Sequence, residues 1–234
     1  LLHGSFANAD MMEAPATGLA SGFRALRLDR RGCGRTTPAT DGPIPLEEEA
    51  DDLLALLDWF SVEKTHFLAH DEGADVALEF CLRNPGRTGS IALLAPTLDG
   101  LPSSPETAAV AADLRAALRA DPVRALGEKL LPSHLFDAAR EREGIFERIE
   151  AIFRRFPQSP GRFDRMPRAG AALAGRLANV SAPTFVLVGE RDEEDRVRCA
   201  KTVASGIPGA ELVVFPDTSR FLHVEESRAV MRKL

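Results

Sequence analysis

The sequence predicts an α/β protein with a mostly parallel sheet, helices on its faces and an inserted helical segment. Short apolar runs alternate with helical patterns, which is typical of strands joined by crossover helices. This rhythm stops between about residues 101 and 177, where helical patterns are separated by Pro, Ser and Gly. The chain has 234 residues, which suits one domain with an inserted subdomain. We expect a core at 1–99 and 178–234 and a helical cap at 100–177.

The individual elements follow from periodicity and from breaker residues. We expect strands at 1–2, 23–28, 65–69, 90–95, 184–188 and 211–215. We expect helices at 46–60, 73–84, 106–118, 143–153 and 196–205, and one more that closes the chain. Leu53, Leu57 and Phe60 recur at helical spacing, so the first of these helices has one apolar face. Pro85 ends the second, because the residue before a proline disfavours helical backbone.

Composition narrows the functional classes. The formal net charge is −6, which provides no basic face for nucleic acid. No apolar run approaches the ~20 residues of a membrane span. The three cysteines, Cys33, Cys81 and Cys199, are few and far apart, which favours a reducing, cytoplasmic location over a disulfide or zinc framework. The Gly32-Cys33-Gly34 loop lacks the third glycine of a dinucleotide fingerprint, so we expect neither a cofactor nor a metal. The sequence leaves the oligomeric state open.

One segment has the pattern of a nucleophile elbow, a sharp turn that lifts a reactive side chain above a sheet. Ala69-His70-Asp71-Glu72-Gly73-Ala74 lies between an expected strand and an expected helix. Small residues two before and two after the turn residue allow strand and helix to pack closely. Ala69 and Gly73 are small, so the raised side chain is that of Asp71.

Together with three other segments, this turn resembles the α/β-hydrolase superfamily. Leu2-His3-Gly4-Ser5-Phe6 is similar to its oxyanion loop, and the run from Asp29 to Arg35 is similar to its Asp-x-Arg-Gly-x-Gly-Arg turn. Val186 to Asp192 is similar to the strand that delivers the catalytic acid. The resemblance covers nearly the whole chain. The family fold starts with a hairpin that is absent here, so we expect that N-terminal residues are missing.

The resemblance implies a triad in the order nucleophile, acid, histidine. Asp71 takes the first position and Asp192 the second, with Asp99 as an alternative acid. A gapless match puts Arg220 in the histidine position, whereas His223 reaches it only by a shift of the alignment. The resemblance also implies an oxyanion hole from the backbone N–H of Glu72 and one from Ser5 or Phe6. His3 and His70 match positions that usually serve the framework of the loop and the turn.

An aspartate at the elbow resembles epoxide hydrolases and haloalkane dehalogenases. A carboxylate that attacks an alkyl carbon forms an ester, which water cleaves if a general base activates it. Histidine suits this task, whereas arginine stays protonated and cannot act as a base. The chain has no tyrosine to protonate an opening epoxide, and Glu72 beside Asp71 would repel a halide. The single tryptophan, Trp59, ends a surface helix, where we expect it far from the site.

Three hypotheses remain at this point. The first is an enzyme on a small organic substrate with an atypical Asp71, Asp192 and Arg220 site. The second is a non-catalytic binding or interaction protein with a degenerate triad. The third is a conventional Asp-type hydrolase in which His223 reaches the site. The arginine-rich run at 140–155 is expected to be a solvated helix face, with steering of an acidic substrate as the alternative.

Overall fold

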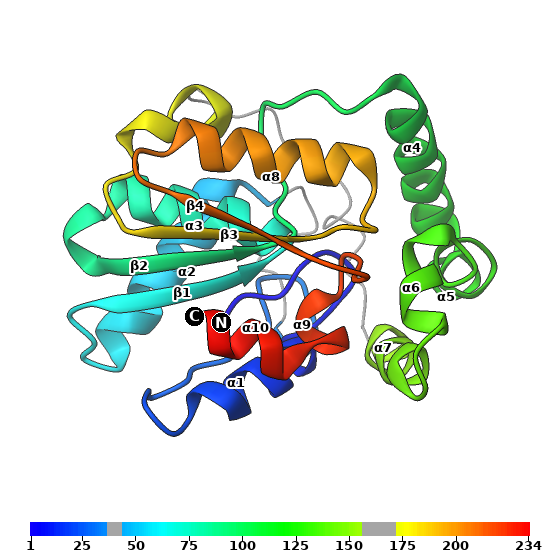
Figure 1. Cartoon of the computed structure of the whole chain (residues 1–234), viewed down its shortest axis with the longest axis horizontal. Helices are drawn as coiled ribbons and strands as arrows, with labels where there is room; N and C mark the ends of the chain where they lie inside the picture. The colour runs from blue at the N-terminus through cyan, green and yellow to red at the C-terminus, as the bar shows by residue number, and fades with distance from the viewer. Residues whose placement is uncertain (37–43, 156–171) are drawn as a thin grey trace.

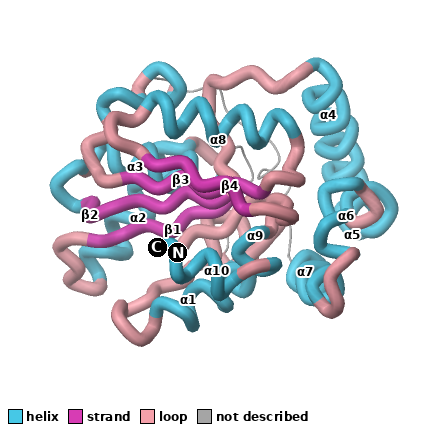
Figure 2. The backbone as a smooth tube through the Cα atoms, in the orientation of Figure 1, coloured by secondary structure: helices cyan, strands magenta, loops and turns pink. Residues whose placement is uncertain are grey.

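A four-stranded parallel sheet forms the centre of the molecule. The computed structural model describes residues 1–36, 44–155 and 172–234. The strands stand in the order β1-β2-β3-β4, and every neighbouring pair is parallel. Their bounds are β1 Thr65–His70, β2 Thr88–Leu94, β3 Thr184–Gly189 and β4 Glu211–Phe215. Figure 2 shows them surrounded by helices. The predicted parallel α/β fold is confirmed.

The strands predicted at 1–2 and 23–28, on the open side of β1, do not form as regular strands. Leu2 makes isolated parallel bridges to Ala69 in β1 and to Leu28, so the sheet continues through single residues. The strand expected at 23–28 is therefore reduced to one bridge. Phe23, its first apolar residue, is 56% exposed. With little burial on either face, alternating Phe, Leu and Arg residues gain too little from packing to hold a regular strand.

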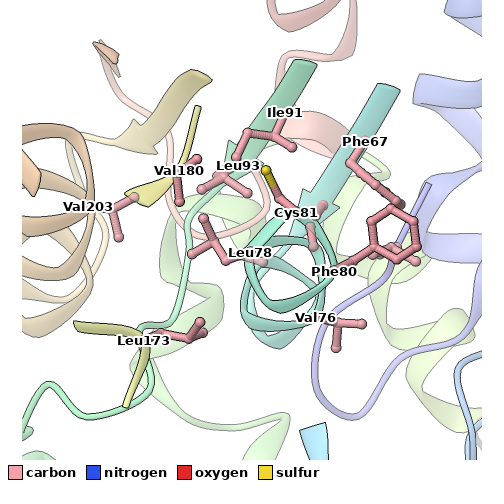
Figure 3. Packing of buried hydrophobic residues seen from close by; sticks show 14 of the residues in the cluster. Phe67, Val76, Leu78, Phe80, Cys81, Ile91, Leu93, Leu173, Val180 and Val203 are labelled. Carbon is pink, nitrogen blue, oxygen red and sulfur yellow. The ribbon is translucent and has the colours of Figure 1, made fainter. Parts of the chain in front are cut away.

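Alternation along the strands explains the layers. Phe67, Ile91, Leu93, Val186 and Val188 pack into one cluster with helices α2 Leu46–Trp59, α3 Glu72–Arg83 and α8 Glu194–Gly206. Figure 3 shows Leu78, Phe80 and Cys81 of α3 in this cluster. The residues in between, such as Leu68, Ala92 and Leu187, face the other side, because successive strand side chains point to opposite faces.

That second face is covered by elements from both ends of the chain. Met12, Leu222 and Val230 pack against it. The helices there are α1 Glu13–Leu19, α9 Leu222–Glu225 and α10 Ser227–Lys233. Figure 1 shows α8 and α3 on one side of the sheet and α1, α9 and α10 on the other. The architecture is thus helix, sheet, helix, as expected for a parallel sheet buried on both faces.

The described part of the segment from 100 to 177 forms helices and turns, without a strand. Its α-helices are α4 Pro105–Ala120, α5 Pro122–Ala125, α6 Asp137–Arg140 and α7 Ile145–Arg154. They lie beyond the carboxyl ends of the strands (Figure 1). Phe136 and Phe153 pack there with Phe221 and Met11, which ties these helices to the loops of the core. The cap boundaries at 100 and 177 stay a prediction.

Single-turn helices fill several connections. They are Ala9–Met12, Pro85–Arg87, Leu126–Leu130, His134–Phe136, Leu173–Gly175 and Leu177–Asn179. Among the residues that the structure describes, no helix combines the length and the apolar character needed to cross a membrane.

Close packing of the elbow supplies a stability prediction. A Cβ on Gly73 would lie 2.8 Å from the His3 carbonyl oxygen and 2.9 Å from that of Leu2. Backbone atoms cannot yield as a side-chain tip can, so Gly73→Ala should lower the free energy of unfolding by about 1–3 kcal/mol. Urea unfolding measures this value. Gly127→Ala is the matched control, since a Cβ there meets no atom within 4 Å and should cause no loss. Equal stability of both variants would contradict the close packing of the elbow.

Candidate active site

Asp71 sits on a strained turn between β1 and α3. Its backbone has φ 52° and ψ −122°, a left-handed conformation that L-residues rarely adopt. Its N–H donates to the Leu94 carbonyl oxygen at 3.0 Å, and its carbonyl oxygen accepts from the Ala74 N–H at 3.0 Å. The turn thereby holds the side chain of Asp71 at the carboxyl end of the sheet, where ligands bind in open α/β folds.

Both oxygens of the Asp71 carboxylate have positive partners. The Ser5 N–H donates to Oδ2 at 2.9 Å, and Nη2 of Arg196 lies 2.9 Å from Oδ1. The side chain of Asp71 is only 5% exposed. Burial by itself would raise the pKa of Asp71, but the charges of Arg196 and Arg220 hold it well below its usual range. Asp71 is therefore an ionised carboxylate at every physiological pH.

Asp192 follows β3 and has the opposite electrostatic character. Its Oδ1 accepts from the Glu193 N–H at 2.8 Å and lies 3.8 Å from Nε of Arg220. The side chain is 2% exposed. Burial raises the pKa of Asp192 to about 6, although the charges of Arg220 and Arg196 act against this rise. Asp192 therefore changes its charge close to neutral pH.

Arg220 lies among carboxylates. Its guanidinium forms ion pairs with Asp192 and with Glu193, and its charge also acts on Asp71. The ring Nε2 of His70 lies 3.0 Å from the backbone carbonyl oxygen of Arg220, which fixes the loop that carries it. Asp71, Asp192 and Arg220, three residues that the sequence singled out, thus belong to one charged cluster.

His223 lies apart from this cluster. It is completely buried, and its ring centroid is 4.3 Å from that of His70. Neither ring nitrogen of His223 has a hydrogen-bond partner among the described residues. Burial, together with the charges of His70 and Arg148, lowers the pKa of His223 well below its usual value. The described residues therefore show no hydrogen bond between His223 and a carboxylate of the cluster.

One of the expected oxyanion donors, the Ser5 N–H, contacts the side chain of Asp71. The Ser5 N–H is bound to its carboxylate, as described above. Phe6 follows with φ 55°, so the loop turns sharply at this point. Glu72 is the first residue of α3, and its carboxylate lies 4.0 Å from the buried guanidinium of Arg30. Ser5 and Glu72 are thus next to the elbow, as the loop pattern predicts.

The remaining residues that the sequence singled out lie in loops or on the surface, away from the charged cluster or at its framework. Asp99 receives the Leu173 N–H at 3.3 Å, and its own N–H donates to Asp75 at 3.0 Å, so it ties two loops together. His3 accepts the Arg30 N–H at 3.0 Å, in keeping with a framework role. Trp59 is 83% exposed on the surface helix α2. Within the arginine-rich run, Arg140, Arg142 and Arg154 form ion pairs with Asp137, Glu226 and Glu150.

Arg196 is the residue that sequence reasoning missed. It stands in the first turn of α8, four positions after Asp192, and is only 12% exposed. A basic residue just after the strand that delivers an acid is a usable signal, because parallel strands bring their carboxyl ends to one edge. The signal is hidden by the acidic neighbours Glu193, Glu194 and Asp195, because a basic residue among them has the pattern of an exposed helix start.

A surface cavity of about 640 Å³ runs along the exposed side of α8. Its lining includes Asp192, Glu194, Arg198 and Lys201, but neither Asp71 nor Arg220. It therefore touches the cluster only at Asp192. In the described ranges, no three His, Cys, Asp or Glu residues are grouped so that they could hold a metal ion.

Comparison with known proteins identifies the family. The chain matches the Alpha/beta hydrolase family over residues 1–233 and belongs to it. It is similar to 2-hydroxy-6-oxononadienedioate/2-hydroxy-6-oxononatrienedioate hydrolase 2 of Pseudomonas putida, with 25% identity over 92% of this chain and 76% of the relative. It is also similar to putative carbamate hydrolase RutD of Variovorax paradoxus, with 28% identity over 92% of this chain and 81% of the relative. The relatives are hydrolases of small molecules, in agreement with the sequence prediction.

Solved structures agree. A hydrolase from Pseudomonas aeruginosa PA01 superposes with a TM-score of 0.83 and 26% identity, covering 99% of this chain and 85% of the other. The enol-lactonase from Burkholderia xenovorans LB400 has a TM-score of 0.82 and 22% identity, with coverage of 99% and 87%. The first of these supports the family, and the second shows the shared fold.

The ion pair between Asp71 and Arg196 yields a stability prediction. Removing one partner of a buried pair leaves the other charge uncompensated, which costs about 3–5 kcal/mol. Arg196→Leu should therefore lower the free energy of unfolding by about that amount in urea titrations. Arg154→Leu is the control, because it removes an exposed pair with Glu150 worth less than about 0.5 kcal/mol. Similar losses in both variants would argue against a buried pair at the elbow.

The two buried histidines predict acid sensitivity. The pKa of His70 is lowered from 6.5 to about 4 by burial, and that of His223 is lowered well below 6.5. Between pH 6.5 and 4 the unfolded chain binds more protons at these residues, so stability falls as pH falls. Asp192 opposes this trend, because its folded pKa of about 6 exceeds its ordinary value of 3.8. The two histidines both lower the free energy of unfolding as the pH falls, and only Asp192 acts in the other direction. We therefore expect a net loss of stability on acidification.

His223→Leu tests this account. The variant removes an imidazole without hydrogen bonds and should reduce the pH dependence of the urea midpoint between pH 4 and 6.5. His66→Gln, a change at an exposed histidine outside this buried pair, is the comparison variant. An unchanged slope in His223→Leu would show that this ring does not titrate on unfolding.

Proposed function

We propose that the protein is an enzyme that acts on a small organic molecule with a carbonyl group, by proton transfer at Asp192. One observation carries this proposal. Two buried carboxyl groups, Asp71 and Asp192, interact with the same two guanidiniums, yet their pKa values are displaced in opposite directions. Pairs of titratable groups with pKa values pushed apart are characteristic of acid–base sites.

In this proposal the two carboxyl groups have different roles. Asp192, with a pKa of about 6, is suited to accept a proton near neutral pH and return it later. Asp71 stays ionised and supplies a fixed negative charge, and the ion pair with Arg196 weakens it as a nucleophile. Arg220 holds Asp192 and offers a positive charge to an anionic group of the substrate. Retro-aldol cleavage fits this set. Asp192 takes the proton of a β-hydroxyl group, the C–C bond breaks to give a carbonyl compound and an enolate, and Asp192 returns the proton to the enolate carbon, so no water is consumed and no histidine is needed to activate it.

The relatives suggest the substrate class. One relative is named as a hydrolase of 2-hydroxy-6-oxononadienedioate, which is an oxo diacid, and another as a putative carbamate hydrolase. We propose a small oxo acid for this chain as well. We further propose a cytoplasmic location, no nucleic-acid partner and no bound cofactor. The location is supported by the three cysteines, Cys33, Cys81 and Cys199, which are buried and far apart in the sequence.

A second candidate is a non-catalytic binding protein. The observation in its favour is the ion-paired state of Asp71, whose two oxygens are already bound to Arg196 and Ser5. In that case ligands bind between the cap and the core without being converted.

The test is a pH profile on a panel of small oxo acids, followed by proton NMR in D₂O for both cleavage and hydrogen exchange. We expect kcat/KM to rise with pH through about 6 and then level off, because the ionised form of Asp192 is the base. Asp192→Asn should lower kcat/KM at least ~10²-fold. Glu211→Gln, a change at an exposed residue of β4 outside the cavity that Asp192 lines, is the control and should keep the profile.

Other outcomes separate the hypotheses. Binding without exchange or cleavage would favour the non-catalytic protein. A stable mass increase on Asp71 after treatment with an alkyl halide or an epoxide would instead favour an aspartate nucleophile that cannot complete hydrolysis.

A further inference from the structure

The carboxylate of Asp71 is bound by a backbone N–H that the family pattern assigns to the oxyanion hole. The Ser5 N–H, expected from the sequence as an oxyanion donor, donates to Oδ2 of Asp71 at 2.9 Å. The guanidinium of Arg196 lies 2.9 Å from Oδ1. The amide hydrogen-bonds one oxygen, and the guanidinium forms an ion pair with the other, which has no hydrogen bond of its own among the described residues. Together they form a charged recognition site for one carboxylate.

The surrounding backbone is shaped to this side chain. A Cβ built on Gly4 would lie 2.5 Å from Cβ and 2.8 Å from Oδ2 of Asp71. The glycine therefore leaves room for the CH₂–COO⁻ group to lie against the loop. Arg220, which is half-buried, adds a second positive charge that acts on Asp71. The site thus has an amide donor, two cations and a space of the size of one acetate ion.

We propose that this cradle, formed by the Ser5 amide, Arg196 and Arg220, is a binding site for small carboxylates that Asp71 fills from within. The elbow side chain acts as an internal ligand and excludes external carboxylates from the position next to the turn. When its CH₂–COO⁻ group is removed, a free monocarboxylate of the same size takes its place. This inference concerns binding at Ser5 and Arg196 and does not rest on proton transfer at Asp192.

The ligand class follows from the geometry. Asp71→Gly deletes one methylene and one carboxylate, which together match acetate. Asp71→Ala retains the β-carbon and leaves room for formate alone. Both ligands carry the single negative charge that Arg196 loses with Asp71, so binding restores the charge balance of the buried site.

The experiment is thermal unfolding of each variant during titration with sodium acetate or sodium formate, against sodium chloride at equal ionic strength. A ligand that binds only the folded state raises Tm with its concentration. We expect acetate to raise the Tm of Asp71→Gly well above the effect of chloride. For Asp71→Ala we expect formate to bind at least about fivefold more tightly than acetate. The wild-type protein should respond to all three salts alike.

Two further variants control for charge and for location. Asp71→Asn fills the space without a negative charge and should show no carboxylate-specific rise in Tm. The double variant Asp71→Gly with Arg196→Gln should lose most of the acetate effect, because one cation of the cradle is gone.

The proposal is overturned if acetate and chloride act equally on Asp71→Gly, or if the wild-type protein responds to acetate as strongly as that variant does. Should Asp71→Gly fail to fold without ligand, the Asp71→Ala variant with formate decides the question by the same comparison. The readout needs no turnover, so a failure here and a failure of the proton-transfer proposal are seen in separate experiments.

Discussion

The ion pair between Asp71 and Arg196 is the interaction on which the character of this site depends. A left-handed turn raises a carboxylate from the centre of the sheet, and such backbone persists only when its surroundings hold it. Here Gly73 lets α3 pack on the first loop, and Gly4 lets that loop approach the raised side chain. The fold has already placed the carboxylate where water is scarce. Arg196 then compensates a charge that would otherwise be costly to bury.

The ion pair with Arg196 argues against nucleophilic attack by Asp71, which is the chemistry that an aspartate at an elbow suggests. A carboxylate held by a guanidinium and an amide is stable as an anion and correspondingly weak as a nucleophile. Arg220 forms an ion pair with Asp192, and as a permanent cation it cannot take up a proton as a histidine ring would. The group that titrates near neutral pH is then Asp192. The two proposals, proton transfer at Asp192 and occupation of the cradle by Asp71, therefore rest on one charge arrangement.

Much of the fold was predictable, because its signals are local. The strands at β1, β2, β3 and β4 are short apolar runs, and their observed bounds lie within two residues of the predicted ones. The stretch 23–28 has a similar pattern but forms one bridge, since strand character depends on what covers the residues. Within the site, the elbow pattern predicted Asp71, and the resemblance to the family implied Asp192 and Arg220. The roles of these residues stay predictions. Arg196 was missed, because its partner lies 125 positions earlier in the chain.

The sequence by itself determined the α/β architecture, the position of the elbow and the identity of the raised residue. Apolar periodicity and small residues around a turn act between near neighbours along the chain, so they can be read without coordinates. Only the tertiary structure decided which cation holds Asp71, that His223 packs against His70 without a hydrogen bond, and that the Ser5 amide is bound to the elbow carboxylate. Charge pairing and burial depend on distances between segments that are remote in sequence, and folding alone sets those distances.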